Sequence, residues 1–275
     1  MTLQSLASRY AASDPAKAER LAEEAVLLAR KFDQPERVYA LAEAGELVVQ
    51  LGKAEQGRKL IEEAAAMAAK MGTADRNIYY RGLVAAPIAP FDLPRAMSLV
   101  EPTDAGSEKD RALARIAKII ALKNLEKALE LVNRLEKQSN QRDNTRMAIA
   151  YQLAPTRLKD ALRVVDSMDT YAAAKTKAEA YGWLAAAVAP QDRQTACSLI
   201  DNSISLFEKN AQEMQGWSSS GGRGAYAARV VAQANAIGYP DMGSLIDRVL
   251  AMRPLADEVS SPRALQKPTG STHLK

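Results

Sequence analysis

The side chains that most often carry out chemistry in proteins are scarce in this chain. It has one histidine, His273, close to the last residue, and one cysteine, Cys197. A Ser-His-Asp or Cys-His arrangement needs a histidine held by a folded element, and an ordinary zinc site needs several histidine or cysteine ligands. A single cysteine also forms no disulfide within the chain. We therefore predict no catalytic residue, no metal and no cofactor, and we do not expect an enzyme.

Two further patterns could serve chemistry, and both have a simpler interpretation. The carboxylates Glu23-Glu24 and Glu62-Glu63 are adjacent, so on a helix they point about 100° apart, whereas acid–base catalysis needs two carboxyl groups that converge on a substrate. Residues 221–224, Gly-Gly-Arg-Gly, precede a predicted helix, whose free N–H groups could bind an anion. This loop lacks the preceding strand and the Lys-Ser/Thr of a phosphate-binding loop. Solvated charges and a flexible connection are the favoured interpretations.

The elements that would position any site come from an internal repeat. An Ala-Pro pair followed by an alanine six positions after the proline occurs at residues 89–96, 154–161 and 189–196. The same frame recurs with leucine in place of proline before Ala128 and Gly57. A repeated pair of helices cannot bury its own apolar face and must stack on its neighbours. The repeat therefore predicts stacked helix pairs.

Small residues mark the start of the second helix in each pair, and an aliphatic residue follows three or four positions later, as on one helix face. They are Ala18, Gly57, Ala96, Ala128, Ala161, Ala196 and Gly243. The partner helices are predicted over residues 37–50, 77–88, 110–121, 145–153, 177–188 and 225–236, with residues 2–11 as the first. We predict an all-α superhelix, or solenoid, of about seven antiparallel helix pairs over residues 1–252. A flexible insert at 216–224 and a disordered tail at 253–275 complete the prediction.

Prolines and short polar side chains predict the turns between paired helices. Proline has no N–H and disfavours helical backbone in the residue before it, so the first helix should end before Pro90, Pro155 and Pro190. A side-chain oxygen at the next helix start can accept from free N–H groups there. The residues predicted to do so are Asp14, Asp92, Asn124 and Thr156.

Composition and charge narrow the class of protein. Hydrophobic residues make up 47% and charged residues 25%, which is typical of a folded domain. Neither a signal peptide nor a run of about 18 apolar residues is visible, so a cytoplasmic location is expected. The net charge is +4, and residues 109–177 hold 15 basic and 8 acidic side chains. Such a basic segment is either a solvated surface or a contact for an acidic partner or nucleic acid.

The first repeats resemble the tetratricopeptide repeat. Residues 41–48, Leu-Ala-Glu-Ala-Gly-Glu-Leu-Val, precede Gly57 and Ala64, and Gly45, Gly57 and Ala64 stand at that family's small positions. Ala18, Ala22 and Ala25 match the second half of such a unit. The resemblance covers about the first quarter of the chain, and later repeats depart from the pattern. It implies a right-handed superhelix whose inner surface, lined by the first helix of each pair, binds an extended peptide or another protein.

The resemblance also implies which residues face a partner. Carrying the family's inner-face positions onto this chain selects Tyr39, Glu46, Gln50, Arg81, Asp110, Asp143, Arg146 and Tyr181. Aromatic rings and arginines are effective anchors for peptides, because they bury a large area at low entropic cost. We expect a non-enzymatic interaction or scaffold module that binds a peptide or protein on this face.

Three alternatives remain open. The basic segment 109–177 could bind nucleic acid or an acidic partner through Lys118, Lys123, Arg157, Lys159 and Arg163. An enzyme built as an α/α toroid would need acids and aromatic rings gathered around one cavity. The chain could also be the regulatory repeat segment of a larger bacterial multidomain protein.

Overall fold

The described part of the chain is entirely helical. The structure, a computed structural model, describes residues 9–11, 13–72, 75–101, 106–136, 140–169, 173–209 and 222–251. These residues form thirteen helices and no strand. The all-α class predicted from the sequence is confirmed. No helix among these residues has both the length and the apolar character needed to cross a membrane.

The chain divides into two compact units, residues 1–180 and 181–275. The helices of the first unit are α2 (Pro15–Ala29), α3 (Glu36–Gln50), α4 (Ala54–Ala69), α5 (Asp75–Ile88), α6 (Leu93–Val100), α7 (Ser107–Ile120), α8 (Leu125–Asn133), α9 (Asn140–Leu153) and α10 (Leu158–Asp166). The division falls within α11 (Ala173–Val188), and the second unit continues with α12 (Arg193–Lys209), α13 (Gly222–Ala236) and α14 (Met242–Ala251). A single array over residues 1–252 stays a prediction.

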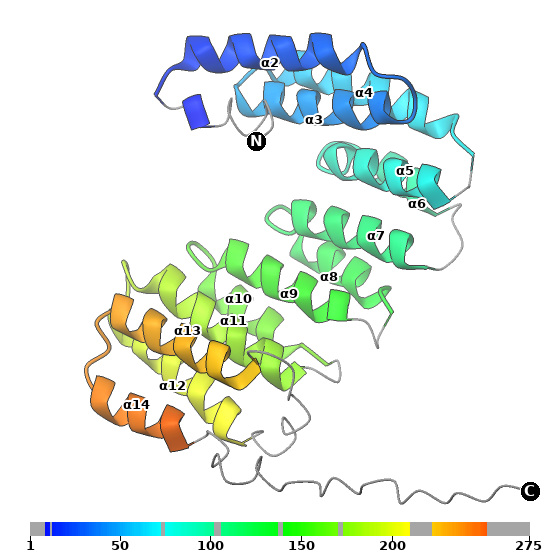
Figure 1. The fold of residues 1–275 in the computed structure, drawn as a ribbon. Coiled ribbons are helices and arrows are strands. Elements are labelled where there is room, and N and C mark those ends of the chain that lie inside the picture. The colour runs from blue at the N-terminus through cyan, green and yellow to red at the C-terminus, as the bar shows by residue number, and fades with distance from the viewer. Residues whose placement is uncertain are drawn as a thin grey trace, which may run out of the picture. The chain divides into compact units, whose positions relative to one another are not determined.

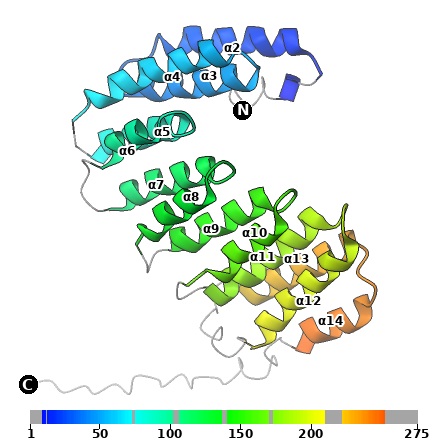
Figure 2. The same ribbon diagram turned by 180° about the vertical axis from the view of Figure 1, so that it is seen from behind.

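Helix pairs build the first unit in two layers (Figures 1 and 2). Each first helix packs on the second helix of its own pair, as α3 does on α4, α5 on α6, α7 on α8 and α9 on α10. The first helices also contact one another in order, α3 with α5, α5 with α7 and α7 with α9. The layer of first helices is therefore continuous through α3, α5, α7 and α9, and any site on it draws residues from several pairs.

The second helix of each pair begins in the same way. A capping residue ends the turn, and its carbonyl accepts the N–H of the residue four positions later, as Asp14 does from Ala18. The same bond reaches the predicted small residue in the next five pairs, at Gly57, Ala96, Ala128, Ala161 and Ala196. All six small residues are buried. The predicted register is confirmed for these six second helices, while most of the predicted first partner helix, residues 2–11, lies outside the described residues.

The seventh small residue was predicted wrongly. In α14 the bond to the capping carbonyl of Asp241 comes from Leu245, which is 1% exposed, whereas Gly243 is exposed. The carboxylate of Asp241 also accepts from the Ser244 N–H at 3.0 Å. The helix start follows the capping side chain, so counting from the nearest small residue misplaced the register by two positions.

The turns agree with the prolines and with three of the four predicted caps. The helices α5, α9 and α11 each end two residues before the proline. The side chains of Asp14, Asp92 and Asn124 accept the N–H three positions later at 3.0 Å. Thr156 is not the cap of α10. Arg157 takes that position without a side-chain cap, and its guanidinium pairs instead with Asp160 at 2.6 Å.

The helices α3 and α4 cross at close range. A methyl group added to Gly45 would come within 2.7 Å of Cγ1 of Ile61 and 2.9 Å of the Gly57 carbonyl. One added to Gly57 would come within 2.6 Å of Cγ2 of Val49. Glycine is therefore required on both helices, since a larger side chain would force the backbones apart.

The second unit has its own core. Ile204 and Phe207 of α12, Val230 of α13 and Leu245 of α14 are each no more than 1% exposed. Arg248 joins α14 to α12 through both oxygens of Glu208, at 2.9 and 2.8 Å. Residues 222–224 belong to α13, although we predicted them as part of the insert. The rest of that insert, 216–221, and the predicted tail from residue 253 lie outside the described residues.

Candidate functional site

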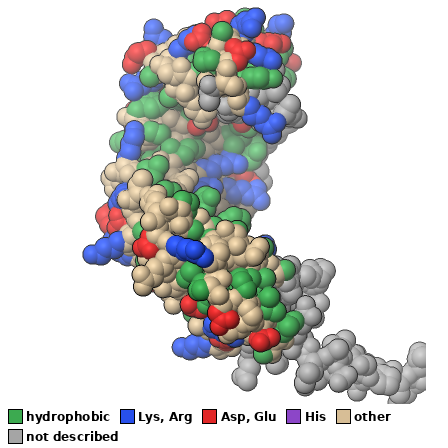
Figure 3. Space-filling model, turned by 90° about the vertical axis from the view of Figure 1, so that its left-hand side faces the viewer, with side chains coloured by type: hydrophobic (Ala, Val, Ile, Leu, Met, Phe, Trp, Pro, Cys, Tyr) green, Lys and Arg blue, Asp and Glu red, His purple; other side chains and the backbone are tan. Residues whose placement is uncertain are grey.

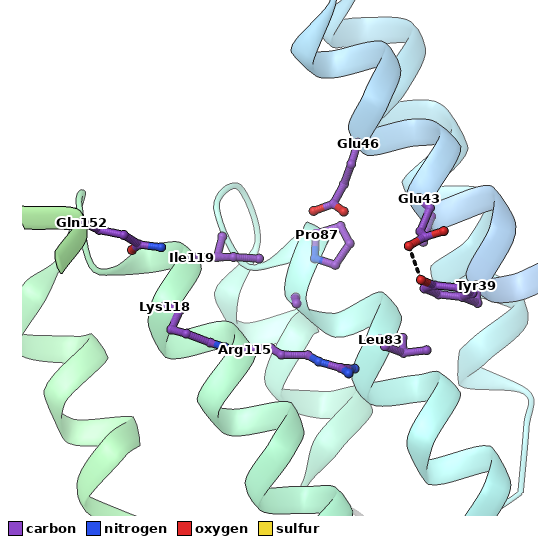
Figure 4. Close-up of a pocket in the computed structure, with 11 residues that line it drawn as sticks. Tyr39, Glu43, Glu46, Leu83, Pro87, Arg115, Lys118, Ile119 and Gln152 are labelled. Atoms are coloured by element: carbon purple, nitrogen blue, oxygen red, sulfur yellow. Dashed lines mark hydrogen bonds between the residues drawn. The ribbon is translucent and has the colours of Figure 1, made fainter. Parts of the chain in front are cut away.

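The layer of first helices contains a cavity of about 410 Å³ (Figure 4). The first helices α3, α5, α7 and α9 all contribute to it. The lining residues are Tyr39, Ala42, Glu43 and Glu46 of α3; Leu83, Ala86 and Pro87 of α5; Arg115, Lys118 and Ile119 of α7; and Gln152 of α9. The middle helix, α5, supplies an apolar floor. The charged side chains come from α3 on one side and from α7 on the other.

The α3 side of the cavity is acidic. Glu43 and Glu46 project from successive turns of α3, and the Tyr39 hydroxyl donates a hydrogen bond to the Glu43 carboxylate. Burial raises the pKa of Glu46 above its usual value, and the neighbouring negative charge of Glu43 raises it further. Burial and the bond to Glu43 likewise raise the pKa of Tyr39. The negative charges of the two carboxylates on this wall repel each other.

The α7 side of the cavity is basic. Arg115 and Lys118 also project from successive turns, and the Arg115 guanidinium carbon lies 5.7 Å from the ring centre of Tyr79. Burial lowers the pKa of Lys118, and the positive charge of Arg115 adds to the effect. Within the described residues, none of the four charged groups Glu43, Glu46, Arg115 and Lys118 forms an ion pair.

A second cavity of about 300 Å³ adjoins the first. Glu46 and Pro87 line both. Its apolar side chains include Val49, which is 40% exposed, and Phe91, which is 37% exposed. The other lining residues are Gln50, Ala54, Arg58, Ile61, Pro90 and Lys123. We call the two cavities together the groove. Figure 3 shows the surface of the first unit hollowed in its upper part, with basic side chains inside the hollow.

The structure brings three of the eight predicted partner-binding residues into the groove. Tyr39 and Glu46 line the larger cavity, and Glu46 and Gln50 line the smaller one. The other five lie elsewhere. Asp110 accepts a hydrogen bond from the Glu136 backbone N–H at 3.1 Å, and Tyr181 is half-buried on α11 in the second unit.

The remaining three predicted residues are buried. Arg81 is 6% exposed, with its Nη1 3.5 Å from the Met71 carbonyl. Asp143 and Arg146, 1% and 4% exposed, form an ion pair at 3.0 Å. These side chains lie within the protein and expose little area to a partner.

Arg146 instead joins three segments of the first unit. Its Nη1 also donates to Asp169, after α10, at 2.5 Å, and its Nη2 donates to Asn133, at the end of α8, at 2.9 Å. Removing one partner of a buried pair leaves an uncompensated charge in the interior. The arrangement accounts for these residues as part of the packing between successive helix pairs.

Three of the groove's charged residues, Glu43, Arg58 and Arg115, were absent from the prediction. Arg115 lies on a helix whose buried face is formed by Leu113, Ile116 and Ile120. Its position between those residues, followed at helical spacing by Lys118 and the 37% exposed Ile119, is a signal of an outward-facing charged stripe. Lys118 was assigned to the nucleic-acid alternative.

The basic segment 109–177 has seven arginines, and most are neutralised. Six of them form ion pairs with carboxylates: Arg111, Arg134, Arg142, Arg146, Arg157 and Arg163. The seventh, Arg115, lies in the groove. The positive charge of this segment that no carboxylate neutralises therefore lies on lysines and on Arg115 in the groove. The described part of the segment has no row of arginines without ion pairs.

The groove residues can recognise a ligand by charge and by apolar contact. The cavities are lined by no histidine or cysteine. No family model matches the chain, and no curated protein matches it.

Proposed function

We propose that the chain is a non-enzymatic interaction module that binds a peptide or protein segment in the groove between α3 and α7. The observation that carries the proposal is the combination of four charged groups that form no ion pair in the described part of the chain and apolar side chains left exposed beside them. Exposed apolar area and concentrated charge in one concave site are typical of binding surfaces. Both cavity volumes, about 410 and 300 Å³, fall in the range of about 300–1,000 Å³ found for ligand sites.

The proposal includes a tetratricopeptide-like solenoid. Four first helices contact one another in order, as they do when helix pairs stack into an array. The Gly45–Gly57 crossing supports the resemblance, because both glycines were matched to the family's small positions and both are required for the close approach of α3 and α4. In such an array the layer of first helices is the inner surface, and the groove lies on it.

The competing nucleic-acid function receives less support. Affinity for nucleic acid depends on cations that are free to neutralise phosphates. Arg157 and Arg163, two of the residues expected to do so, pair with Asp160 and Glu126. Lys118 and Lys123 line the groove beside carboxylates, which would repel a phosphate backbone.

The proposal is tested by selecting binders from a random displayed-peptide library on the immobilised full chain. The recovered peptides are then measured by fluorescence anisotropy against the parent and against Ile119→Asp, which places a charge at the rim of the groove. Ile246→Asp is the matched control, since Ile246 is equally exposed, at 40% against 37%, but lies on α14. Circular dichroism establishes that both variants fold.

We expect Ile119→Asp to weaken binding at least tenfold, which corresponds to about 1.4 kcal/mol, and Ile246→Asp to leave it unchanged. Recovery of no specific peptide, or of peptides that bind both variants as tightly as the parent, would overturn the proposed function.

A further inference from the structure

Charges in the groove are arranged differently from those elsewhere on the protein. Outside it, opposite charges meet, as in Lys127–Glu130 and Arg163–Glu126, both at 2.7 Å. In the larger cavity of the groove, like charges stand together: two carboxylates on α3 and two cations on α7. Like charges one helical turn apart are mutually destabilising. A ligand that carries the opposite charge at each wall would relieve both repulsions.

The order of the helices places the two walls on opposite sides of α5. This helix contacts both α3 and α7, and its Leu83, Ala86 and Pro87 form the apolar floor. Figure 4 shows Glu46 directed from α3 toward Pro87, while Arg115 and Lys118 extend from α7. A ligand lying on α5 therefore has an acidic wall along one edge and a basic wall along the other.

An extended peptide can present different side chains to the two edges. Successive side chains of an extended chain point to opposite sides, and those two positions apart are about 6.8 Å from each other along the chain. Glu43 and Glu46 are three residues apart, or about 4.5 Å along the helix axis, and so are Arg115 and Lys118. The difference is small against the length of a lysine or glutamate side chain. Two alternating residue pairs thus match the four wall charges.

We propose that the groove selects an extended peptide in which basic and acidic residues alternate, with the basic side chains facing α3 and the acidic side chains facing α7. This inference rests on the proposed function and adds the charge pattern of the ligand. The exposed Val49 and Phe91 in the adjoining cavity would contact an apolar residue next to the charged stretch.

The inference is tested with four synthetic peptides of equal length. Each has four charged residues between two leucines, an amino-terminal fluorophore and an amidated carboxyl end. Their central residues are alternating lysine and glutamate, two lysines followed by two glutamates, four lysines, or four glutamates. The first two have the same composition and net charge, so they differ only in which side each charge faces. Binding to the full chain is measured by fluorescence anisotropy.

We expect the alternating peptide to bind at least tenfold more tightly than each of the other three. The double variant Glu43→Gln, Glu46→Gln should remove its advantage over the four-glutamate peptide. Arg115→Gln with Lys118→Gln should remove its advantage over the four-lysine peptide. Arg163→Gln, an exposed arginine outside the groove, is the control and should change none of these ratios.

Equal affinity for the alternating and block peptides would overturn the inference and leave the proposed function standing, since both would still bind. So would failure of all four peptides when library-selected peptides bind in an Ile119-dependent way. If the library also gives no groove-dependent ligand, the proposed function itself fails.

Discussion

Replacing Gly57 by alanine should destabilise the first unit, because the added methyl group has no space at the α3–α4 crossing. Its Cβ would lie 2.6 Å from Cγ2 of Val49 and 2.7 Å from the Val49 backbone nitrogen. A side chain could rotate away, but the backbone nitrogen could move only with the whole of α3. Overpacking of this kind costs about 1–3 kcal/mol, and a backbone contact places Gly57→Ala at the upper end of that range.

Alanine also favours a helix over glycine by about 1 kcal/mol, which partly offsets the clash. The expected net loss is about 2 kcal/mol. For a unit of 180 residues this corresponds to a decrease in Tm of about 4–8 °C. Thermal unfolding followed by circular dichroism at 222 nm, the usual helix band, would measure it.

The matched control is Gly243→Ala. That glycine is also helical, but the nearest atom to its added Cβ is Oδ1 of Asp241 at 3.8 Å. This substitution should leave the Tm unchanged or raise it. If Gly57→Ala were as stable as the parent, the close approach of α3 and α4, and with it the support for a tetratricopeptide-like crossing, would be refuted.

Three further predictions concern charge and capping. Burial and the charge of Glu43 raise the pKa of Glu46, so ionisation of Glu46 destabilises the folded state at neutral pH. The substitution Glu46→Gln should therefore raise the Tm at pH 7. This gain should disappear below about pH 4, where glutamate is protonated in both the folded and the unfolded state. Arg146→Leu should cost about 3–5 kcal/mol in urea unfolding, because Asp143 would remain buried and charged, and adding Asp143→Asn should recover part of the loss. Asn124→Ala should cost about 1 kcal/mol through loss of its cap, whereas Thr156→Ala should be neutral; equal losses would contradict the assignment of Arg157 as the cap.

Local sequence signals predicted the helix pairs well. Prolines end α5, α9 and α11 where expected, and six small residues occupy the buried position four residues after a cap. These features follow from sterics and hydrogen bonding over a few residues, so one sequence is enough to find them. The last pair was misplaced because Gly243 is small but exposed, while Asp241 sets the helix start.

The site was harder to predict, because it depends on contacts between helices far apart in sequence. Tyr39, Glu46 and Gln50, which line the groove, were selected from the resemblance, which covers about the first quarter of the chain. Where the resemblance weakens, the transferred positions Asp143 and Arg146 point into a buried ion pair. The local spacing places Arg115 on an outward face, but it does not tell whether such a residue pairs with a carboxylate on another helix, as Arg163 does, or forms no ion pair within the described residues, as Arg115 does.

Site-specific photo-crosslinking tests the central claim, that partners bind on the layer of first helices, most directly. A benzophenone side chain would replace Ile119, at the rim of the groove, or Leu27, which is 62% exposed on α2 and lines neither cavity. A library-selected peptide would be irradiated with each full-length variant and the adducts identified by mass spectrometry. We expect a crosslink from position 119 and none from position 27. Crosslinking from position 27 alone, or equally from both, would contradict a binding site in the groove.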